Sequence, residues 1–393
     1  MTEFTQRVPA RPRARRSESA PLAFARRLDW ILLLAAAALV GYGLWVVSGI
    51  TRFDVPGDQN YFVVRQGMAA AVGAVGLVLA AVVPLDLARR HWKLVYGSTL
   101  SLMVFVFVVA EAVRGSKRWI DLGVIQFQPS ELGKVLFVLA LAGFLIERGG
   151  EVTRWRTIAK ALALGCAPIV LVFLQPDLGT ALVYATALFA VLFFVGVRWR
   201  QLLLLIGLGA LAVAGVLWLL PSAGVQVLKP YQAARLTLDP GADPGGITYN
   251  LNQSITAVGS GGLTGRGVVA ASQTRLDYLP EHATDFAFAS LAEQRGFVGC
   301  AILLLLYLLV VWRGLRIITG AGDLYGVVVA GGLVVSFLFQ VFVNVGMTMG
   351  VAPVTGIPLP FVTVGGSSMV TCLVLIGVLQ NIHARGELAR LGS

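Results

Sequence analysis

The stretch "WILLLAAAALVGYGLWVVSGI", residues 30–50, decides the fold class because it carries no charged side chain anywhere along its length. A helix needs about 20 such residues to cross the hydrocarbon core of a bilayer. The apolar part of a cleaved signal peptide is shorter, so we interpret this stretch as a retained membrane span. The sequence therefore predicts that the chain enters a membrane near its N-terminus.

Similar apolar runs follow along the whole chain. Of the 393 residues, 57% are hydrophobic and 13% are charged, and the mean hydropathy is +0.81. Soluble domains carry roughly 25% charged residues, and membrane β-strands would show alternating segments of about 10 residues. We therefore predict an all-α polytopic membrane protein with ten transmembrane helices, at residues 30–50, 61–83, 94–113, 129–146, 157–174, 177–196, 201–220, 297–312, 324–350 and 362–382.

The basic residues set the predicted topology. The stretch "RVPARPRARR" precedes the first span, and most of the other Lys and Arg fall in short connections on that same side. The positive-inside rule then places both termini in the cytoplasm and the long loop 221–296 outside. The same distribution indicates that the net charge of +11 is a topology signal and not a nucleic-acid site. We divide the chain into a basic tail (1–26), a ten-span membrane domain (27–384) and a C-terminal cytoplasmic tail (385–393).

Two charged features enter predicted spans at their outer ends. Glu131 and Lys134 are three residues apart, so they share one face of the fourth span. Charged residues inside a membrane helix are functional candidates, but this pair could also serve only to anchor the helix end. Asp177 begins the sixth span, where a carboxylate suits the helix N-cap and the helix dipole.

Two further features lie at the predicted external surface. Arg118 and Trp119 could be interfacial anchors or an anion site for a lipid head group. In "EHATDFAFASLAEQRG", residues 281–296, spacing alone favours Thr284 or Asp285 as the cap of a short helix over a catalytic role. Because all four features share one side of the membrane, an outward-facing acid–base site could be built from them.

The long loop contains the stretch "YNLNQSITAVGSGGLTGRG", residues 249–267. Leu251, Ile255 and Val258 recur at helical spacing and predict a helix. The glycines that follow predict a backbone that closely approaches a ligand or a neighbouring helix.

Five stretches, in order, resemble the SEDS family (shape, elongation, division, sporulation). They are "GSKRWIDLGVIQFQPSELGKV", "QPDLGTALV", "YNLNQSITAVGSGGLTGRG", "LPEHATDFAFASLAEQRGFVG" and "NVGMTMGVAPVTGIPLPFVTVGGSSM". The resemblance runs from about residue 28 to 384. It implies a ten-span, inverting peptidoglycan glycosyltransferase of the bacterial cytoplasmic membrane, which polymerises lipid II into β-1,4 glycan strands at the outer face. It also implies a class B penicillin-binding protein as the cross-linking partner. "PVTGIPLPF" and the short C-terminal tail resemble RodA, the elongation member, more than FtsW, the division member.

The resemblance also assigns residues. The acid of the family's "HTDF" motif corresponds to Asp285, and its "PSE..K" pair corresponds to Glu131 and Lys134. We predict these three as catalytic, with Asp285 as the base on the acceptor hydroxyl and Lys134 at the diphosphate. The predicted substrate-binding residues are Arg118, Trp119, Asp177, Gln253 and Ser254.

The family's usual histidine before Thr-Asp is replaced here by Ala283, and His282 lies one residue earlier, so we assign His282 no role. No motif requires a cofactor or metal, although Asp177 could hold a divalent cation such as Mg²⁺. Two alternatives from other classes are a lipid II flippase, which needs access from both faces, and a scaffold that only activates its partner. An FtsW-like division polymerase is the alternative within the family.

Overall fold

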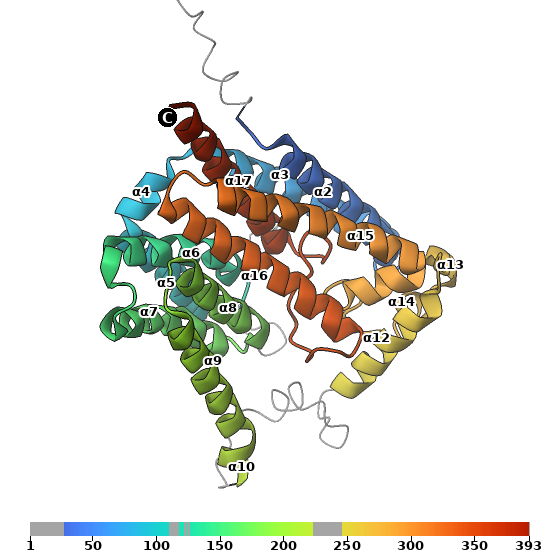
Figure 1. Ribbon diagram of the computed structural model, residues 1–393. Helices are drawn as coiled ribbons and strands as arrows, with labels where there is room; N and C mark the ends of the chain where they lie inside the picture. The colour runs from blue at the N-terminus through green and yellow to red at the C-terminus, as the bar shows by residue number, and fades with distance from the viewer. Residues whose placement is uncertain (1–26, 110–117, 122, 124–125, 223–245, 393) are drawn as a thin grey trace, which may run out of the picture.

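The computed structural model describes residues 27–109, 118–121, 123, 126–222 and 246–392. The predicted basic tail 1–26 and residues 223–245 of the predicted long loop lie outside this part. The described chain is almost entirely helical, as Figure 1 shows. Its elements are α2 (Trp30–Ile50), α3 (Tyr61–Val82), α4 (Leu85–Arg90), α5 (Trp92–Val109), β1 (Ile120–Asp121), β2 (Gln126–Phe127), α6 (Pro129–Glu147), η1 (Gly149–Glu151), α7 (Trp155–Leu174), α8 (Leu178–Phe194), α9 (Trp199–Ala214), η2 (Gly215–Leu219), α10 (Leu220–Ser222), α12 (Ile247–Gly261), α13 (Gly267–Ala270), α14 (Ser272–Arg275), α15 (Ala287–Gly320), α16 (Leu324–Thr348) and α17 (Gly366–Gly392).

Each predicted apolar run falls on one of these helices. In the described part, eight helices are long and apolar enough to cross a membrane, namely α2, α3, α5, α6, α7, α15, α16 and α17. The runs at 177–196 and 201–220 fall on the shorter apolar helices α8 and α9. The prediction of a helical, multi-pass membrane protein is confirmed.

Two predicted boundaries can be compared with the helices. Helix α15 begins at Ala287 but is broken at Gly296, so a short helix ends the predicted long loop and the second part of α15 begins at the predicted residue 297. Helix α17 continues to Gly392, so the chain shows no structural break at the predicted domain boundary 384. Apolar composition marks the part of a helix that lipid surrounds, whereas the helix itself continues as long as its backbone hydrogen bonds do.

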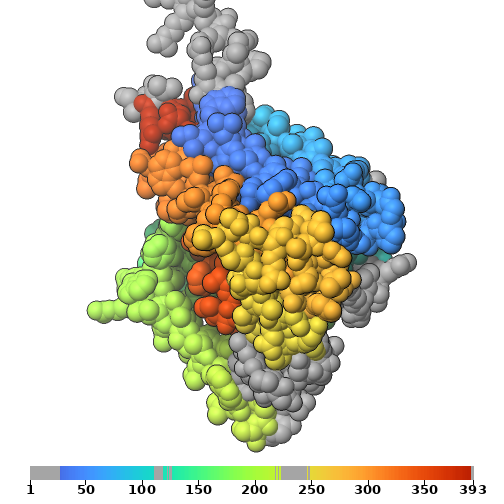
Figure 2. Space-filling model, turned by 90° about the vertical axis from the view of Figure 1, so that its right-hand side faces the viewer, coloured from blue at the N-terminus to red at the C-terminus, as the bar shows by residue number. Residues whose placement is uncertain are grey.

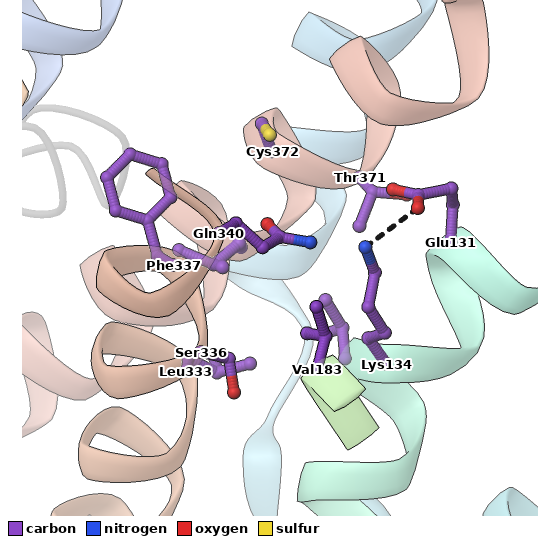
Figure 3. Close-up of a pocket in the computed structure, with 11 residues that line it drawn as sticks. Glu131, Lys134, Val183, Leu333, Ser336, Phe337, Gln340, Thr371 and Cys372 are labelled. Carbon is purple, nitrogen blue, oxygen red and sulfur yellow. Dashed lines mark hydrogen bonds and ion pairs between the residues drawn. The ribbon is translucent and has the colours of Figure 1, made fainter. Parts of the chain in front are cut away.

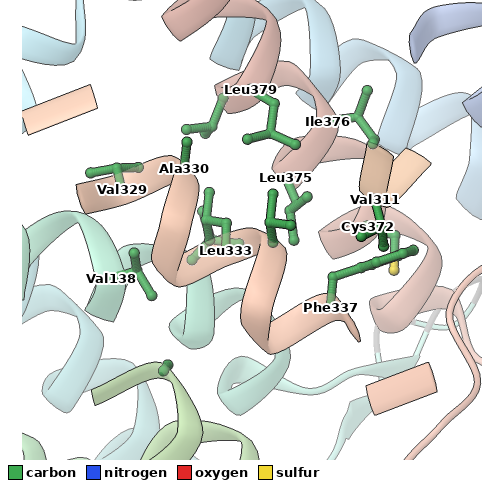
Figure 4. Packing of buried hydrophobic residues seen from close by; sticks show 14 of the residues in the cluster. Val138, Val311, Val329, Ala330, Leu333, Phe337, Cys372, Leu375, Ile376 and Leu379 are labelled. Atoms are coloured by element: carbon green, nitrogen blue, oxygen red, sulfur yellow. The ribbon is translucent and has the colours of Figure 1, made fainter. Parts of the chain in front are cut away.

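Helices α6, α16 and α17 form the centre of the bundle. The apolar segments of α6 and α17 are 83% buried, whereas that of α3 is only 17% buried. Figure 4 shows side chains of α6, α16 and α17 packed together, including Val138, Leu333 and Leu375. Apolar side chains facing lipid need no burial, so the outer helices remain largely exposed. Polar groups on the three central helices are thereby shielded from lipid.

The segment after residue 245 packs against α15 and α16, and appears in yellow in Figure 2. Helix α12 confirms the helix predicted from apolar spacing. The glycine-rich stretch lies against a break in α15 at Gly296, which has φ 64°. There Phe297 donates its N–H to the carbonyl of Gly262, and a Cβ on Gly265 would come within 2.3 Å of the Gln294 carbonyl oxygen. The glycines therefore serve a close approach to a neighbouring helix.

A buried ion pair joins three helices at the end of the bundle that carries the C-terminus. Asp29 caps α2 by accepting from the Leu32 N–H, and its other oxygen accepts from Arg313 Nη2 at 2.6 Å and Nε at 2.8 Å. The side chain of Gln380 on α17 donates to the Asp29 carbonyl and accepts from its N–H. Every polar atom of Asp29 thus has a partner.

Candidate active site

Helix α6 places the first two predicted residues. Its N-cap is Gln128 and Pro129 stands in its first turn, where the missing N–H of proline costs no hydrogen bond. Lys134 Nζ donates to Glu131 Oε1 at 2.8 Å, and only 8% and 4% of the two side chains are exposed. The shared face predicted from their spacing is confirmed. The pair is buried in the bundle and does not extend to the membrane surface.

The pair lies in a cavity between four helices (Figure 3). The free space inside it is small, about 20 Å³, which is room for roughly one water molecule. The other lining residues are Val135, Val183, Leu333, Ser336, Phe337, Gln340, Thr371, Cys372 and Leu375. Lys134 has three N–H donors and uses one of them within the described part of the chain. The remaining donors can bind an anion that enters the cavity.

Helix α16 carries a stripe of four polar residues at four-residue spacing. All four side chains are buried, and they are Ser336, Gln340, Asn344 and Thr348. Residues four apart lie on one face of a helix, about 6 Å apart along its axis. Polar groups inside a membrane bundle are costly, so the stripe is a functional candidate in its own right. The sequence contains this spacing, which could have revealed these residues before the structure.

The polar stripe connects Asp285 to the cavity. Asn344 Nδ2 donates to the Asp285 carbonyl at 3.1 Å and to the Ile357 carbonyl at 2.7 Å. Gln340 lines the Glu131–Lys134 cavity one helical turn earlier. The backbone of the half-buried Asp285 and the cavity of the buried ion pair thus both adjoin the same face of α16. The N-cap of α15 is Phe286, so neither of the predicted cap residues, Thr284 and Asp285, occupies that position.

Arg118 and Asp177 form a second cluster at the turn between α7 and α8. Arg118 donates through Nε to the Gln175 carbonyl at 2.7 Å and through Nη2 to the Pro176 carbonyl. Its guanidinium also lies 5.9 Å from the centre of the Trp119 ring and 3.9 Å from Asp177 Oδ2. In this conformation the guanidinium holds the turn, so most of its donors face the protein. Its predicted substrate-binding role stays a prediction.

Asp177 caps α8, as its position predicted. Its Oδ1 accepts from the Thr180 N–H at 3.0 Å, and its Oδ2 accepts from Gln128 Nε2 at 3.0 Å. Gln128 also donates its N–H to Ser367 Oγ of α17, so the ends of α6, α8 and α17 meet here. Each carboxylate oxygen accepts one hydrogen bond here, and the suggested divalent cation at Asp177 stays a prediction. Across the described residues, no three or more His, Cys, Asp or Glu side chains gather as a metal site.

Gln253 and Ser254 lie on α12. Ser254 is fully buried and donates through Oγ to the Thr348 carbonyl at 2.8 Å, which fastens α12 to the end of α16. Gln253 is partly exposed. Through Ser254, α12 contacts the helix that carries the polar stripe. The predicted contact of Gln253 and Ser254 with substrate stays a prediction.

His282 holds the loop before α15 to the connection between α2 and α3. Its Nε2 lies 3.1 Å from Asp54 Oδ1, and its Nδ1 lies 3.5 Å from Asp277 Oδ1. Burial disfavours the imidazolium, but the hydrogen bond to Asp54 and the charges of Asp54 and Asp277 outweigh it, so the pKa of His282 is raised above its usual value. No local pattern indicates this contact, because His282 and Asp54 are 228 residues apart.

Comparison with known proteins decides the family. Residues 26–387 match the family model that covers FtsW, RodA and SpoVE, described as "Cell cycle protein". The chain belongs to this family. The SEDS resemblance seen in the motifs is therefore confirmed.

Three similar proteins give the match its extent. The chain is 37% identical over 366 residues to "Peptidoglycan glycosyltransferase MrdB" of Escherichia coli K12, covering 92% of this chain and 95% of MrdB. It resembles a chain from "Structural coordination of polymerization and crosslinking by a peptidoglycan synthase complex" with TM-score 0.76 and 32% identity. This match covers 91% of this chain and 97% of that chain. It also resembles Thermus thermophilus "Rod shape determining protein RodA" with TM-score 0.66 and 30% identity. This match covers 91% of this chain and 96% of the RodA chain. The fold is that of RodA, and the name of MrdB agrees with the predicted glycosyltransferase class.

Proposed function

We propose that the chain is a RodA-like peptidoglycan glycosyltransferase that polymerises lipid II into β-1,4 glycan strands. The observation that carries this proposal is that the backbone of Asp285 and the cavity of the Glu131–Lys134 pair adjoin one face of α16. The donor sugar of lipid II bears a diphosphate leaving group, and the acceptor is a sugar hydroxyl. The reaction therefore needs positive charge near the diphosphate and a base near the hydroxyl.

Asp285 is the proposed base. Its carboxylate takes the proton of the acceptor 4-hydroxyl while that oxygen bonds to the anomeric carbon of the donor. The bond from that carbon to the diphosphate breaks, and the electron pair leaves with the diphosphate. Direct displacement inverts the α-linked donor to a β-1,4 link.

Lys134 is the proposed site for the leaving diphosphate. Its ammonium faces the cavity with donors to spare, while Glu131 holds it by a single hydrogen bond. An ammonium in a buried site attracts a developing anion more strongly than it would in water. Glu131 orients Lys134 and keeps the pair neutral when the cavity contains no anion.

The proposed setting is the cytoplasmic membrane of a bacterium, with ten spans, both termini inside and the site at the outer face. Arg89, Arg313 and Arg385 form ion pairs at the C-terminal end of the bundle, which suits the positive-inside rule. No ATP is available outside, so the diphosphate bond of the donor drives the reaction. The exposed apolar faces of the outer helices suit the polyprenyl tail of the substrate.

The proposed partner is a class B penicillin-binding protein, which cross-links the new strands. Its support is the similarity to a chain from a peptidoglycan synthase complex that polymerises and cross-links. The two activities must meet outside the membrane because the cross-linking enzyme acts on the finished strand.

The test uses the full-length chain with this partner, purified in detergent and supplied with lipid II. The transpeptidase is blocked with a β-lactam so that uncross-linked strands can be resolved on a gel. We expect a ladder of glycan strands with the complex and none with the partner alone. A flippase moves lipid II across a membrane and would make no polymer in detergent. An absence of polymer would therefore favour that alternative and contradict the proposal.

A further inference from the structure

We infer that Ser290, Thr363 and Asn344 are positioning residues that fix Asp285 by binding the main-chain carbonyls around it. The inference rests on the proposed role of Asp285 as the base. It concerns the four residues from 282 to 285, which lie in a loop before α15 begins. A loop leaves its carbonyls without the regular partners that a helix supplies.

Each of the four consecutive carbonyls accepts one hydrogen bond from elsewhere in the fold. The carbonyl of His282 accepts from Ser290 Oγ at 3.1 Å, that of Ala283 from the Val364 N–H at 3.0 Å, that of Thr284 from Thr363 Oγ1 at 3.0 Å, and that of Asp285 from Asn344 Nδ2 at 3.1 Å. The donors come from α15, α16 and the connection between α16 and α17. The main chain of this segment is thus held from three directions.

The backbone on either side of these contacts is strained. Glu281 has φ 56° and Phe361, in the connection that supplies two of the donors, has φ 65°. Residues other than glycine rarely adopt this region, and they do so where surrounding contacts hold them. The clamp on residues 282–285 supplies such contacts, which indicates that the path of the loop is fixed by its neighbours.

Asn344 links the clamp to the cavity. It is fully buried, and both of its N–H groups are used, one on Asp285 and one on Ile357. Its Oδ1 is buried with no hydrogen-bond partner in the described part of the chain. An unpaired buried acceptor is costly, so the orientation of this amide is set by the two carbonyls it binds. Gln340, one turn earlier on the same helix, lines the Glu131–Lys134 cavity, so α16 links the clamp to that cavity.

Thr363 offers the sharpest test because its hydroxyl has two bonds. Oγ1 accepts from the Leu359 N–H at 2.8 Å and donates to the Thr284 carbonyl at 3.0 Å. Serine can make both bonds, whereas valine has the shape of threonine and makes neither. The pair Thr363→Val and Thr363→Ser therefore separates the hydroxyl from the volume of the side chain.

The experiment measures kcat and KM for lipid II polymerisation by the full-length complex. A displacement of about 1 Å at a reacting group can cost roughly 10²-fold in rate, so we expect Thr363→Val to lower kcat by about 10–100-fold. We expect KM for lipid II to stay near the wild-type value and Thr363→Ser to restore kcat. A fault in folding alone would lower the yield of folded Thr363→Val and leave its kcat per folded molecule unchanged.

Further variants keep the inference testable if Thr363→Val does not fold. Ser290→Ala removes one hydroxyl and little volume, and we expect a smaller fall in kcat from it. Tyr325→Phe is the matched control, because its buried hydroxyl donates to the Leu139 carbonyl at the opposite end of α16. We expect this variant to keep the wild-type kcat.

Asp285→Asn distinguishes a failure of the positioning inference from a failure of the proposed base. If Asp285→Asn is inactive while Thr363→Val and Ser290→Ala keep the wild-type kcat, the positioning inference is wrong and the proposed base stands. If Asp285→Asn polymerises normally, the proposed function of Asp285 is wrong. Loss of kcat in Thr363→Ser equal to that in Thr363→Val would also overturn the inference.

Discussion

Two buried ion pairs in this bundle differ in how completely their polar atoms are bonded. Asp29 accepts a helix N–H and two donors from Arg313, while Gln380 binds both of its main-chain groups. Glu131 and Lys134 share one hydrogen bond and face a cavity. A saturated network holds three helices together, whereas the unsaturated one keeps donors available for a ligand. Within a membrane bundle, spare hydrogen-bonding capacity distinguishes a site from a structural contact.

The largest expected effect is on stability at the saturated pair. Arg313→Ala leaves the Asp29 carboxylate buried without its partner, which typically costs about 3–5 kcal/mol. We expect a clearly lowered thermal midpoint and yield in detergent, with polymerisation per folded molecule retained. An unchanged thermal midpoint would show that the Asp29–Arg313 pair does not stabilise the fold.

Lys134→Ala is expected to lower the rate, which Arg313→Ala does not. Loss of one preorganised group that stabilises developing charge lowers kcat by about 10²–10³-fold. The variant also leaves the buried Glu131 carboxylate without its partner, so we expect a lowered thermal midpoint together with a lower kcat per folded molecule. The measurement is glycan synthesis from lipid II, with Arg313→Ala as the companion variant. Wild-type synthesis by Lys134→Ala would show that the diphosphate binds elsewhere.

Two buried glutamines sharpen the comparison. Gln380 completes the saturated network and Gln340 lines the cavity. Gln380→Leu leaves the buried Asp29 N–H unpaired, whereas the Asp29 carbonyl keeps its bond from the Leu33 N–H, and we expect a loss of about 1–3 kcal/mol in stability with little effect on kcat. For Gln340→Leu we expect about a tenfold fall in kcat, the value of one hydrogen bond to a charged group, with stability retained. Swapped outcomes for the two variants would contradict the distinction.

The smallest expected effect depends on pH. The pKa of His282 is raised in the folded protein, so its contacts with Asp54 and Asp277 stabilise the fold fully below the unfolded pKa of about 6.5. That contribution is lost as the pH rises through the higher folded pKa. We expect the thermal midpoint to fall over this window in the wild type and to vary less in His282→Gln. A midpoint that changes equally with pH in both proteins would show that another group titrates.

The sequence predicted what depends on composition and local spacing. Apolar runs revealed the membrane helices because lipid requires them, and the three-residue separation of Glu131 and Lys134 predicted their pairing. The position of Asp177 before a span predicted its role as a cap. These features need no knowledge of what lies across the fold.

Long-range contacts had no such local signal. Asn344 is 59 residues from the Asp285 carbonyl that it binds, and no spacing within either stretch indicates their meeting. Capping by Thr284 or Asp285 seemed favourable from residue type, but α15 starts at Ala287 and takes Phe286 as its N-cap. Tertiary contacts on the loop carbonyls decide its path, and they override the local preference.

The most direct test of the account is glycan synthesis by Asp285→Asn. The variant keeps the shape of the side chain and removes its basicity, so the rate should fall by about 10²–10⁴-fold. Purified complexes of the wild type and the variant with their penicillin-binding partner are compared on lipid II, and strands are counted on a gel. We expect Asp285→Asn to form a normally folded complex that makes almost no polymer. Polymer at the wild-type rate would contradict it.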